Sequence, residues 1–354
     1  MDPRVDVFCH ILPKRYDAER WKRVEKTNFV KHSPSHLKYV AGGKAPTQEN
    51  IKILMDLDAR WRMMDEFPNY RQVISVASPP VEAVDPDDSE YLAKILNDEI
   101  AELVQKYPDR FAGGACSLPL NKPEAAAREL ERCIKDLKLC TVQIFSNVNG
   151  KPLDLPEFRP VFEICSKANM PILLHPARAI DVPDYASEKD SKFIIWQVFG
   201  WPYETTAAMT RIVFGGVMDD YPNLKIICHH SGAMVPFFSG RIVSMYRMLE
   251  PLVVAERGGR PFSKPIIEYF RSFYTDVSTF TTASIECAAD FFGVDHVIFG
   301  TDAPFDFEGG RASIRECTDA IQKSRFSAAD KSKIFHGNFE AYFRAPALAS
   351  AARA

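Results

Sequence analysis

The sequence carries little net charge and lacks the segments that mark membrane or secreted proteins. Its formal net charge is −3 over 354 residues, which gives no general attraction to nucleic acid or to an anionic membrane. No apolar run approaches the ~18 residues of a membrane span. The start of the chain, Met1 to Arg4, lacks the apolar core of a secretory signal. We therefore expect a cytoplasmic protein whose partners include neither nucleic acid nor membrane.

Paired cysteines and a glycine-rich nucleotide loop are also missing. The eight cysteines are scattered and form no C-x-x-C motif, which is typical of reduced thiols in a cytoplasm rather than of a disulfide framework. No G-x-G-x-x-G follows the first apolar run, which disfavours a doubly wound sheet that binds a dinucleotide.

What the sequence does contain is a regular alternation of short apolar runs with helical patterns. Eight such runs predict parallel strands that are buried on both faces: residues 5–9, 72–77, 111–118, 141–145, 171–175, 224–230, 273–277 and 297–302. Eight strand–helix units in a chain of this length predict an α/β fold, a (β/α)8 barrel formed as one domain over residues 1–344. We expect insertions after strands 1 and 5, at residues 14–46 and 177–200. The Ala-rich tail, 345–354, is expected to be disordered.

Four of these runs end in a histidine or an aspartate. His10 ends the first, His175 the fifth, His229 and His230 the sixth, and Asp302 the eighth. Because the strand C-termini of such a barrel meet at one rim, we expect these side chains to share one site. Imidazole and carboxylate groups suit a divalent metal, with zinc first and manganese, cobalt or iron as alternatives.

Several ordered motifs resemble one branch of a known superfamily. They include V-D-V-F-C-H-I-L-P-K at 5–14, L-L-H-P at 173–176, H-S-G-A-M-V-P-F at 230–237 and G-T-D-A-P-F at 300–305. Together they resemble the amidohydrolase superfamily, in the branch of aminocarboxymuconate-semialdehyde decarboxylase and related aromatic-acid decarboxylases. The likeness covers nearly the whole chain and implies a metal-dependent barrel enzyme, often a homodimer, without an organic cofactor.

The resemblance also implies roles for single residues. His10 looks like the second histidine of the family's H-x-H pair, His175 like the strand-five ligand, and Asp302 like the aspartate that touches the metal and moves a proton. His230 resembles the histidine that serves acid/base chemistry. His229 is expected to be a packing residue, because neighbours on a strand face opposite ways, unless a local bulge turns it inward.

One position departs from the family pattern. Phe8 stands where the first histidine of the H-x-H pair, or a glutamate, is found, and phenylalanine cannot bind a metal. Three interpretations stay open: a metal held by His10, His175 and Asp302 with added waters, a substitute ligand such as His229, or a site without metal. The first is favoured, because three protein ligands and water are normal in catalytic sites, and Phe8 then forms an apolar wall.

Other residues are candidates for binding the substrate. Arg178 and Arg241 could meet a substrate carboxylate, the latter across a dimer interface, since the guanidinium fork suits that geometry. A structural ion pair is at least an equal explanation for Arg178. Trp201 and Phe305 could flank a flat ring, although apolar packing is an equal explanation for the former. Arg60 lies in a helix expected over residues 48–67, capped by Thr47, and is expected on a solvated face.

The function predicted from these observations is the non-oxidative decarboxylation of an aromatic, hydroxybenzoate-like acid or a muconate-type acid. His230 and Asp302 are the expected acid/base pair. Two alternatives remain open at this point. One is a metal-dependent hydrolase or hydratase of a lactone, amide or unsaturated acid, and the other is a non-catalytic barrel that binds small acids, since fold alone does not fix function.

Overall fold

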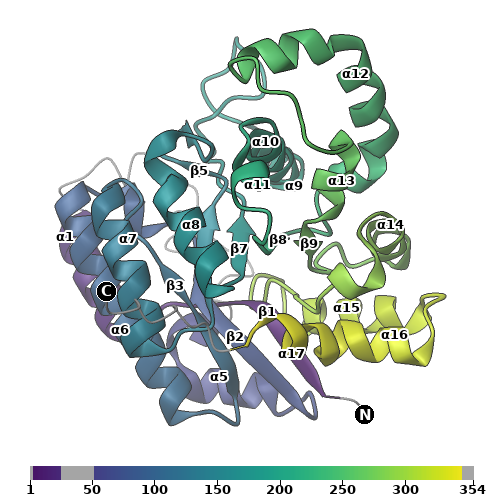
Figure 1. Ribbon diagram of the computed structural model, residues 1–354. Coiled ribbons are helices and arrows are strands. Elements are labelled where there is room, and N and C mark those ends of the chain that lie inside the picture. Colours follow the sequence, from purple (N-terminus) through teal and green to yellow (C-terminus); the bar gives the residue numbers. More distant parts are fainter. Residues whose placement is uncertain (1–2, 25–51, 345–354) are drawn as a thin grey trace, which may run out of the picture.

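The structure, a computed structural model that describes residues 3–24 and 52–344, is built around a curled parallel sheet (Figure 1). Its strand order is β1-β2-β3-β4-β7-β8-β9, and every neighbouring pair is parallel. The strands are β1 (Arg4–Ile11), β2 (Tyr70–Val76), β3 (Phe111–Ser117), β4 (Thr141–Phe145), β7 (Ile172–His175), β8 (Ile226–Cys228) and β9 (Tyr274–Thr275). A separate two-stranded hairpin pairs β5 (Asn147–Val148) with β6 (Lys151–Pro152). The expected α/β fold with a parallel sheet is confirmed.

Residues 297–303 lie between β9 and β1 without forming a regular strand. The backbone nitrogen of Ile298 donates to the carbonyl of Thr275 at 2.8 Å on one side. On the other side, the nitrogen of Asp302 donates to the carbonyl of Phe8 at 3.0 Å. This segment therefore connects the two edge strands of the seven-stranded sheet, so the first strand and the end of the expected eighth strand are neighbours.

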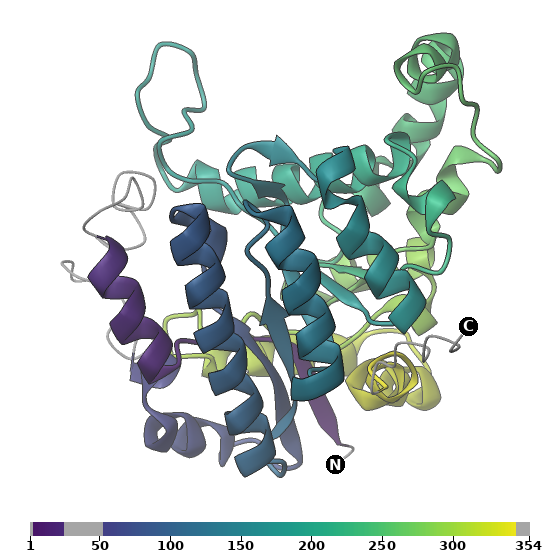
Figure 2. The same cartoon turned by 60° about the vertical axis from the view of Figure 1, so that its left-hand side comes forward.

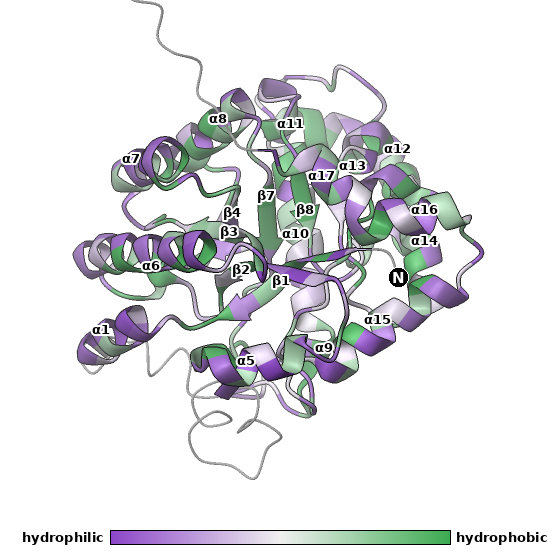
Figure 3. Cartoon of the chain, turned by 90° about the horizontal axis from the view of Figure 1, so that it is seen from below, coloured by the Kyte–Doolittle hydropathy of each residue, from purple (hydrophilic) through white to green (hydrophobic). Residues whose placement is uncertain are grey.

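Helices α6 (Pro86–Lys106), α7 (Pro123–Arg132) and α8 (Arg159–Ala168) cover the outer face of the sheet, as the end-on view shows (Figure 3). The other helices of the described residues are α1 (Lys14–Val24), α5 (Leu57–Met64), α9 (Ile195–Val198), α10 (Gly200–Phe214), α11 (Val217–Asp220), α12 (Val235–Glu256), α13 (Ile266–Arg271), α14 (Thr282–Phe292), α15 (Arg311–Lys323), α16 (Ala328–Ser332) and α17 (Asn338–Tyr342). The chain between β7 and α9 extends as a loop away from the body (Figure 2). Within the described ranges, no helix is long and apolar enough to cross a membrane.

Alternation along the strands separates an inner core from an outer one. Phe8, Leu173 and Ile227 pack together inside the sheet's curve, with exposed fractions of 0%. The next residues along β7 and β8, Leu174 and Cys228, belong to the layer between sheet and helices. Because side chains alternate faces along a strand, the residue that follows each outer one faces inward again. This register directs the polar residues at the strand ends toward one another.

The N-terminal part differs from the expectation in two places. Residues 14–24, expected as part of an irregular insertion, form helix α1, while 25–51, with Thr47, lie outside the described residues. The helix expected over 48–67 is interrupted at Asp56, whose side chain accepts hydrogen bonds from the backbone of residues 58 and 59 and so caps α5. The tail, 345–354, also lies outside the described residues.

Arg60 on α5 is fully buried, so its assignment to a solvated face is wrong. Its guanidinium donates to Gln72 Oε1 at 2.6 Å and to the backbone carbonyl of His10. The helical pattern was correct, but the face that carries Arg60 packs against the end of β1. A buried guanidinium is stable there because carbonyl and amide oxygens accept its hydrogen bonds.

Candidate metal centre

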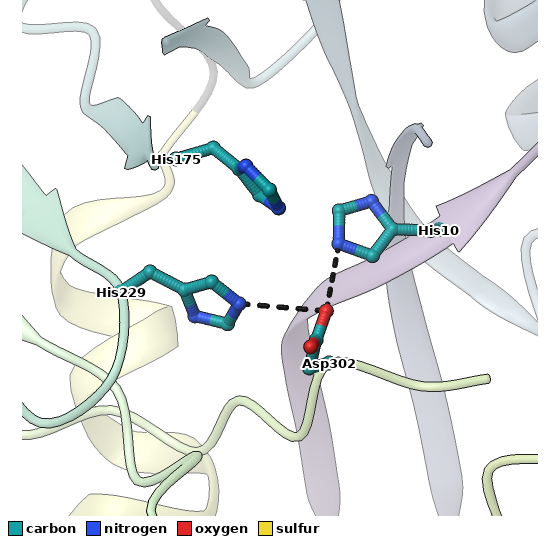
Figure 4. Close-up of side chains that lie close together, drawn as sticks. All are labelled: His10, His175, His229 and Asp302. Atoms are coloured by element: carbon teal, nitrogen blue, oxygen red, sulfur yellow. Dashed lines mark ion pairs between the residues drawn. The ribbon is translucent and has the colours of Figure 1, made fainter. Parts of the chain in front are cut away.

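Four side chains converge at the C-terminal ends of β1, β7 and β8 and on the segment after β9. They are His10, His175, His229 and Asp302, and one ligand atom of each lies within 4.8 Å of the others. Figure 4 shows all four pointing toward one another. Asp302 Oδ1 lies 3.1 Å from His10 Nε2 and 3.4 Å from His229 Nε2. The structure thus brings together the three expected ligands, and it adds a fourth group.

Each of the three imidazoles is held by an acceptor on its Nδ1 side. His10 Nδ1 donates to the carbonyl of Val76 at 3.1 Å, and His175 Nδ1 donates to the carbonyl of Pro176 at 2.8 Å. His229 Nδ1 bonds to the carboxylate of Asp276. Because the proton of a neutral imidazole resides on the nitrogen that donates, each ring in its neutral form presents the lone pair of Nε2 to the site.

Burial and mutual proximity shift the protonation of these groups. Burial, together with His10 and His229, lowers the pKa of His175 well below its usual value. Burial alone would raise the pKa of Asp302, but contacts with His10 and His229 outweigh it and hold that pKa well below its usual range. Burial would lower the pKa of His229, yet Asp276 and Asp302 raise it to about 10. The cluster therefore combines an ionised carboxylate with neighbouring imidazoles, in which a positive charge on one ring disfavours protonation of the others.

This donor set fits a divalent metal ion. The Nε2 atoms of His10 and His229 are buried and, among the described residues, have no well-formed hydrogen bond. A buried polar atom without a hydrogen bond costs free energy, and a cation between the imidazoles and the carboxylate would satisfy all of them. Three imidazoles and one carboxylate are a nitrogen/oxygen set suited to zinc or manganese.

His229, expected to pack away from the site, instead faces it. Strand β8 ends at Cys228, and His229 follows the inward-facing Ile227 by two positions, as His175 follows Leu173. The sequence therefore contained a pattern that predicts the direction of His229: it lies two positions after an inward-facing strand residue, and alternate residues of a strand share one face.

His230 lies beyond the strand end, in a left-handed turn with φ 60°. Its ring stacks on that of His229 with centroids 4.0 Å apart and lies 6.4 Å from the ring of Trp201. Burial, followed by the charge on His229, lowers the pKa of His230 to about 4. Its Nδ1 has no hydrogen-bond partner in the part of the chain that the structure describes. His230 thus lies beside the four-residue cluster and outside it.

Aromatic rings enclose the cluster on several sides. The ring of Phe8 stacks on His229 with centroids 4.2 Å apart and planes 14° apart. Phe305 lies 5.4 Å from the ring of His10, and Trp201 lies 5.8 Å from the ring of His175. Phe8 therefore occupies the place expected of an apolar wall, and Phe305 and Trp201 lie against the imidazoles of His10 and His175.

A cavity of about 810 Å³ lies next to the cluster, on the same rim. Trp201 and Arg178 both line it, and Trp201 Nε1 donates to the carbonyl of Arg178 at 3.1 Å. Arg178 also pairs with Glu204 at 3.3 Å and approaches Asp184 at 4.0 Å. The cavity walls do not include the four cluster residues, but Trp201 lines the cavity and its ring contacts that of His175.

Arg241 lies elsewhere on the molecule. It is part of α12 and lines an apolar groove of about 430 Å³ between α10 and α12, together with Met234 and Phe238. Within a single chain, the structure does not bring Arg241 to the cavity beside the metal cluster. A substrate contact from this residue would have to come from another copy of the chain.

Comparison with known proteins places the chain in a family. The sequence model described as Amidohydrolase (Amidohydro_2) matches residues 52–344. The chain belongs to this amidohydrolase family, which confirms the resemblance that the strand-end motifs indicated.

Relatives with assigned activities are decarboxylases. The 2-amino-3-carboxymuconate-6-semialdehyde decarboxylase of Dictyostelium discoideum is 31% identical over 343 residues, covering 95% of this chain and 90% of that protein. The gamma-resorcylate decarboxylase of Polaromonas sp. (strain JS666) is 32% identical over 302 residues, covering 82% of this chain and 88% of that protein.

A solved structure of similar fold is also that of a decarboxylase. The 5-carboxyvanillate decarboxylase of Novosphingobium aromaticivorans, complexed with manganese and 4-hydroxy-3-methoxy-5-nitrobenzoic acid, has a TM-score of 0.82 and 25% identity, covering 97% of this chain and 96% of that one. A divalent metal is therefore a feature of this relative, and the metal it carries is manganese rather than the expected zinc.

Proposed function

We propose that the protein is a metal-dependent, non-oxidative decarboxylase of a hydroxybenzoate-like or muconate-type acid. The observation that carries the proposal is the convergence of His10, His175 and Asp302 at one rim, in a chain whose named relatives are decarboxylases of such acids. The proposal includes a complete (β/α)8 barrel in which residues 297–303 serve as the eighth strand, with insertions after strands 1 and 5.

His10, His175 and Asp302 would hold the metal through Nε2, Nε2 and Oδ1. A divalent cation bound there supplies Lewis-acid attraction for the substrate's carboxylate and a neighbouring oxygen. Zinc remains our first choice from the ligand types, and manganese is the alternative because a relative carries it.

Decarboxylation requires a proton at the carbon that loses CO2. The ring of His230 stacks on His229 at 4.0 Å and lies 6.4 Å from the ring of Trp201, and its buried Nδ1 lacks a hydrogen-bond partner among the described residues. It can therefore exchange a proton with a substrate that enters from the cavity. Asp302 Oδ1 already contacts two imidazoles, which leaves its other oxygen to receive or return a proton. Together these residues form the proposed acid/base pair.

The cavity beside the cluster is the proposed substrate site. An aromatic ring would lie against Trp201, with Phe305 and Phe8 excluding water from the neighbouring imidazoles. Arg178 faces the same cavity and would attract a second acidic group, although its ion pair with Glu204 reduces its free charge. A flat, anionic substrate fits this combination of aromatic and cationic groups.

The test is a panel of carboxylated phenols and muconates, incubated with zinc- or manganese-loaded protein in deuterated water. We expect CO2 release and one deuterium at the vacated carbon, and Asp302→Asn should abolish both signals. Hydrolysis of lactones or amides with no CO2 from any acid would instead establish the hydrolase. Tight binding of acids with no turnover would establish the non-catalytic barrel.

We further propose that the protein forms a homodimer through α12. Several large apolar side chains on this helix are exposed: Phe237 at 79%, Phe238 at 41%, Met248 at 64%, Leu249 at 44% and Leu252 at 55%. An apolar face of this kind is typical of an interaction surface. Light scattering should give twice the mass of the 40.0 kDa chain, and a monomer at micromolar concentration would contradict the proposal.

A further inference from the structure

Arg178 reaches the cavity beside the metal cluster from the loop that follows β7. It comes three residues after His175, and its side chain is 15% exposed. An arginine side chain carries several N–H donors, but that of Arg178 forms a single hydrogen bond within the described part of the chain, from Nη1 to Glu204 Oε1 at 3.3 Å. Its Nη2 lies 4.0 Å from Asp184, which is too far for a hydrogen bond. Arg178 therefore retains donors that a bound anion could use.

The ion pair between Arg178 and Glu204 is a weak one. Hydrogen bonds between guanidinium and carboxylate groups are usually about 2.7–2.9 Å long and often come in pairs, whereas this one is single and 3.3 Å long. Both side chains are partly accessible, and both line the cavity. Burial raises the pKa of the Glu204 carboxyl, and the neighbouring Arg178 does not cancel that rise. Glu204 thus leaves Arg178 incompletely paired.

The first turn of α10 holds Arg178 in place. A Cβ on Gly200 would lie 2.5 Å from Arg178 Cδ and 2.9 Å from its Nε, so the arginine crosses the helix at a position that glycine leaves open. Trp201 Nε1 donates to the backbone carbonyl of Arg178 at 3.1 Å, and the ring of Trp201 lies 5.8 Å from that of His175. One helical turn therefore fixes the arginine beside an aromatic ring that also contacts the metal cluster.

The other charged side chains along the described cavity wall offer no second position for an anion. Arg211, the other cation there, donates from Nε and Nη2 to the two carboxylate oxygens of Asp154 at 2.9 and 3.0 Å. Asp85 and Asp181 also line the cavity and would repel a carboxylate. An anionic group that enters the cavity therefore has its favourable position at Arg178.

We propose that Arg178 and Glu204 make the protein selective for dicarboxylic acids. One carboxylate of the substrate reaches the metal cluster, and the second displaces Glu204 as the partner of Arg178. This inference rests on the proposed function and narrows its substrate class to acids that carry two carboxylates. The competing explanation is a structural ion pair, in which Arg178 and Glu204 only hold α10 against the loop after β7.

Matched pairs of acids test this selectivity: isophthalate against benzoate, and muconate against sorbate. In each pair the first acid has one more carboxylate. Dissociation constants would come from quenching of tryptophan fluorescence in metal-loaded protein, since Trp196 and Trp201 line the cavity, and circular dichroism would check the fold. We expect the parent protein to bind at least one dicarboxylate roughly 10-fold more tightly than its matched monocarboxylate, the usual gain from one hydrogen bond between charged groups.

Two substitutions should change this preference in opposite directions. Arg178→Gln should lower it by roughly 10-fold, because the cation is lost, and Gly200→Ala, which displaces the arginine, should also lower it. Glu204→Gln should raise it by roughly 3-fold or more, because the competing carboxylate is removed. The matched control is Arg211→Gln, which removes a cation already bound to Asp154 and should leave the preference within about 2-fold of the parent's.

A structural ion pair predicts a different result, because loss of either partner would then change the affinity for both acids of a pair alike. A preference that is absent in the parent, or that does not move in opposite directions in Arg178→Gln and Glu204→Gln, would overturn the selectivity while leaving the decarboxylase proposal intact. Opposite shifts in a protein that releases no CO2 from any acid would uphold the selectivity and refute the proposed function.

Discussion

Glu82 is a buried carboxyl group outside the metal cluster, and it should make stability depend on pH. It lies in the one-turn helix Val81–Ala83 with an exposed fraction of 3%. Asn121 and Asn149 donate to its backbone carbonyl, but its Oε1 has no partner among the described residues. Burial raises the pKa of this carboxyl from 4.5 to about 8. Between these two pKa values the Glu82 carboxyl is therefore protonated in the folded protein and ionised in the unfolded chain.

The sign and size of the effect follow from this difference. Between about pH 4.5 and pH 8 the folded state binds more protons, so the free energy of unfolding falls as pH rises, by about 1.4 kcal/mol per pH unit. The full gap between 4.5 and about 8 corresponds to a loss of about 5 kcal/mol above pH 8. Below about pH 4.5 both states are protonated and the loss disappears.

Glu82→Gln removes the titrating group while keeping its shape. Urea unfolding of both proteins near pH 5, 7 and 9 would give the difference in free energy of unfolding at each pH. We expect the variant to gain about 3 kcal/mol or more over the parent between pH 5 and pH 9. The matched control is Glu157→Gln, an exposed glutamate in another one-turn helix, whose carboxylate lies at the surface beside Lys151. A Glu82→Gln difference that is constant across this range would refute the reasoning.

Three further predictions concern the rest of the structure. Arg60→Met should lower the free energy of unfolding by about 2–4 kcal/mol, because His10 and Gln72 each lose a charge-assisted hydrogen bond; chemical denaturation measures this, and an unchanged stability would contradict it. Gly232→Ala should destabilise by about 2 kcal/mol or more, since φ is 73° and the added Cβ would lie 2.4 Å from the ring of Phe292; a melting temperature equal to the parent's would exclude that clash. Dialysis against a chelator should lower the melting temperature, and zinc or manganese at ~100 times Kd should restore about 2.7 kcal/mol; a melting temperature indifferent to both treatments would argue against a metal centre.

The sequence predicted the strand-end site well because the relevant signals are local. A run of apolar residues that ends in histidine places the side chain at the end of a buried strand, and this pattern located His10 and His175. The position of Asp302 followed from the same rule, although its segment forms no regular strand. Backbone hydrogen bonds join this segment to β9 at Ile298 and to β1 at Phe299, Asp302 and Ala303.

Other features depend on contacts that no local pattern reveals. Asp276 meets His229 only because β8 and β9 are neighbours, paired through Ile227 and Tyr274. The burial of Arg60 depends on which face of α5 meets β1. The direction in which His229 points could have been inferred from the inward register of Ile227, but only after the strand's inner face was known.

The origin of the cluster residues has a consequence for how the protein is made. Asp302 comes from the segment that joins the last strand to the first, while His10 lies on the first strand itself, 292 positions earlier in the chain. A growing chain on the ribosome displays His10 early and completes the pair only after nearly the whole barrel has been synthesised. Contacts between such distant residues form late and slowly. A metal ion that needs both His10 and Asp302 as ligands would therefore bind only after the segment that carries Asp302 has been synthesised and has joined the first strand.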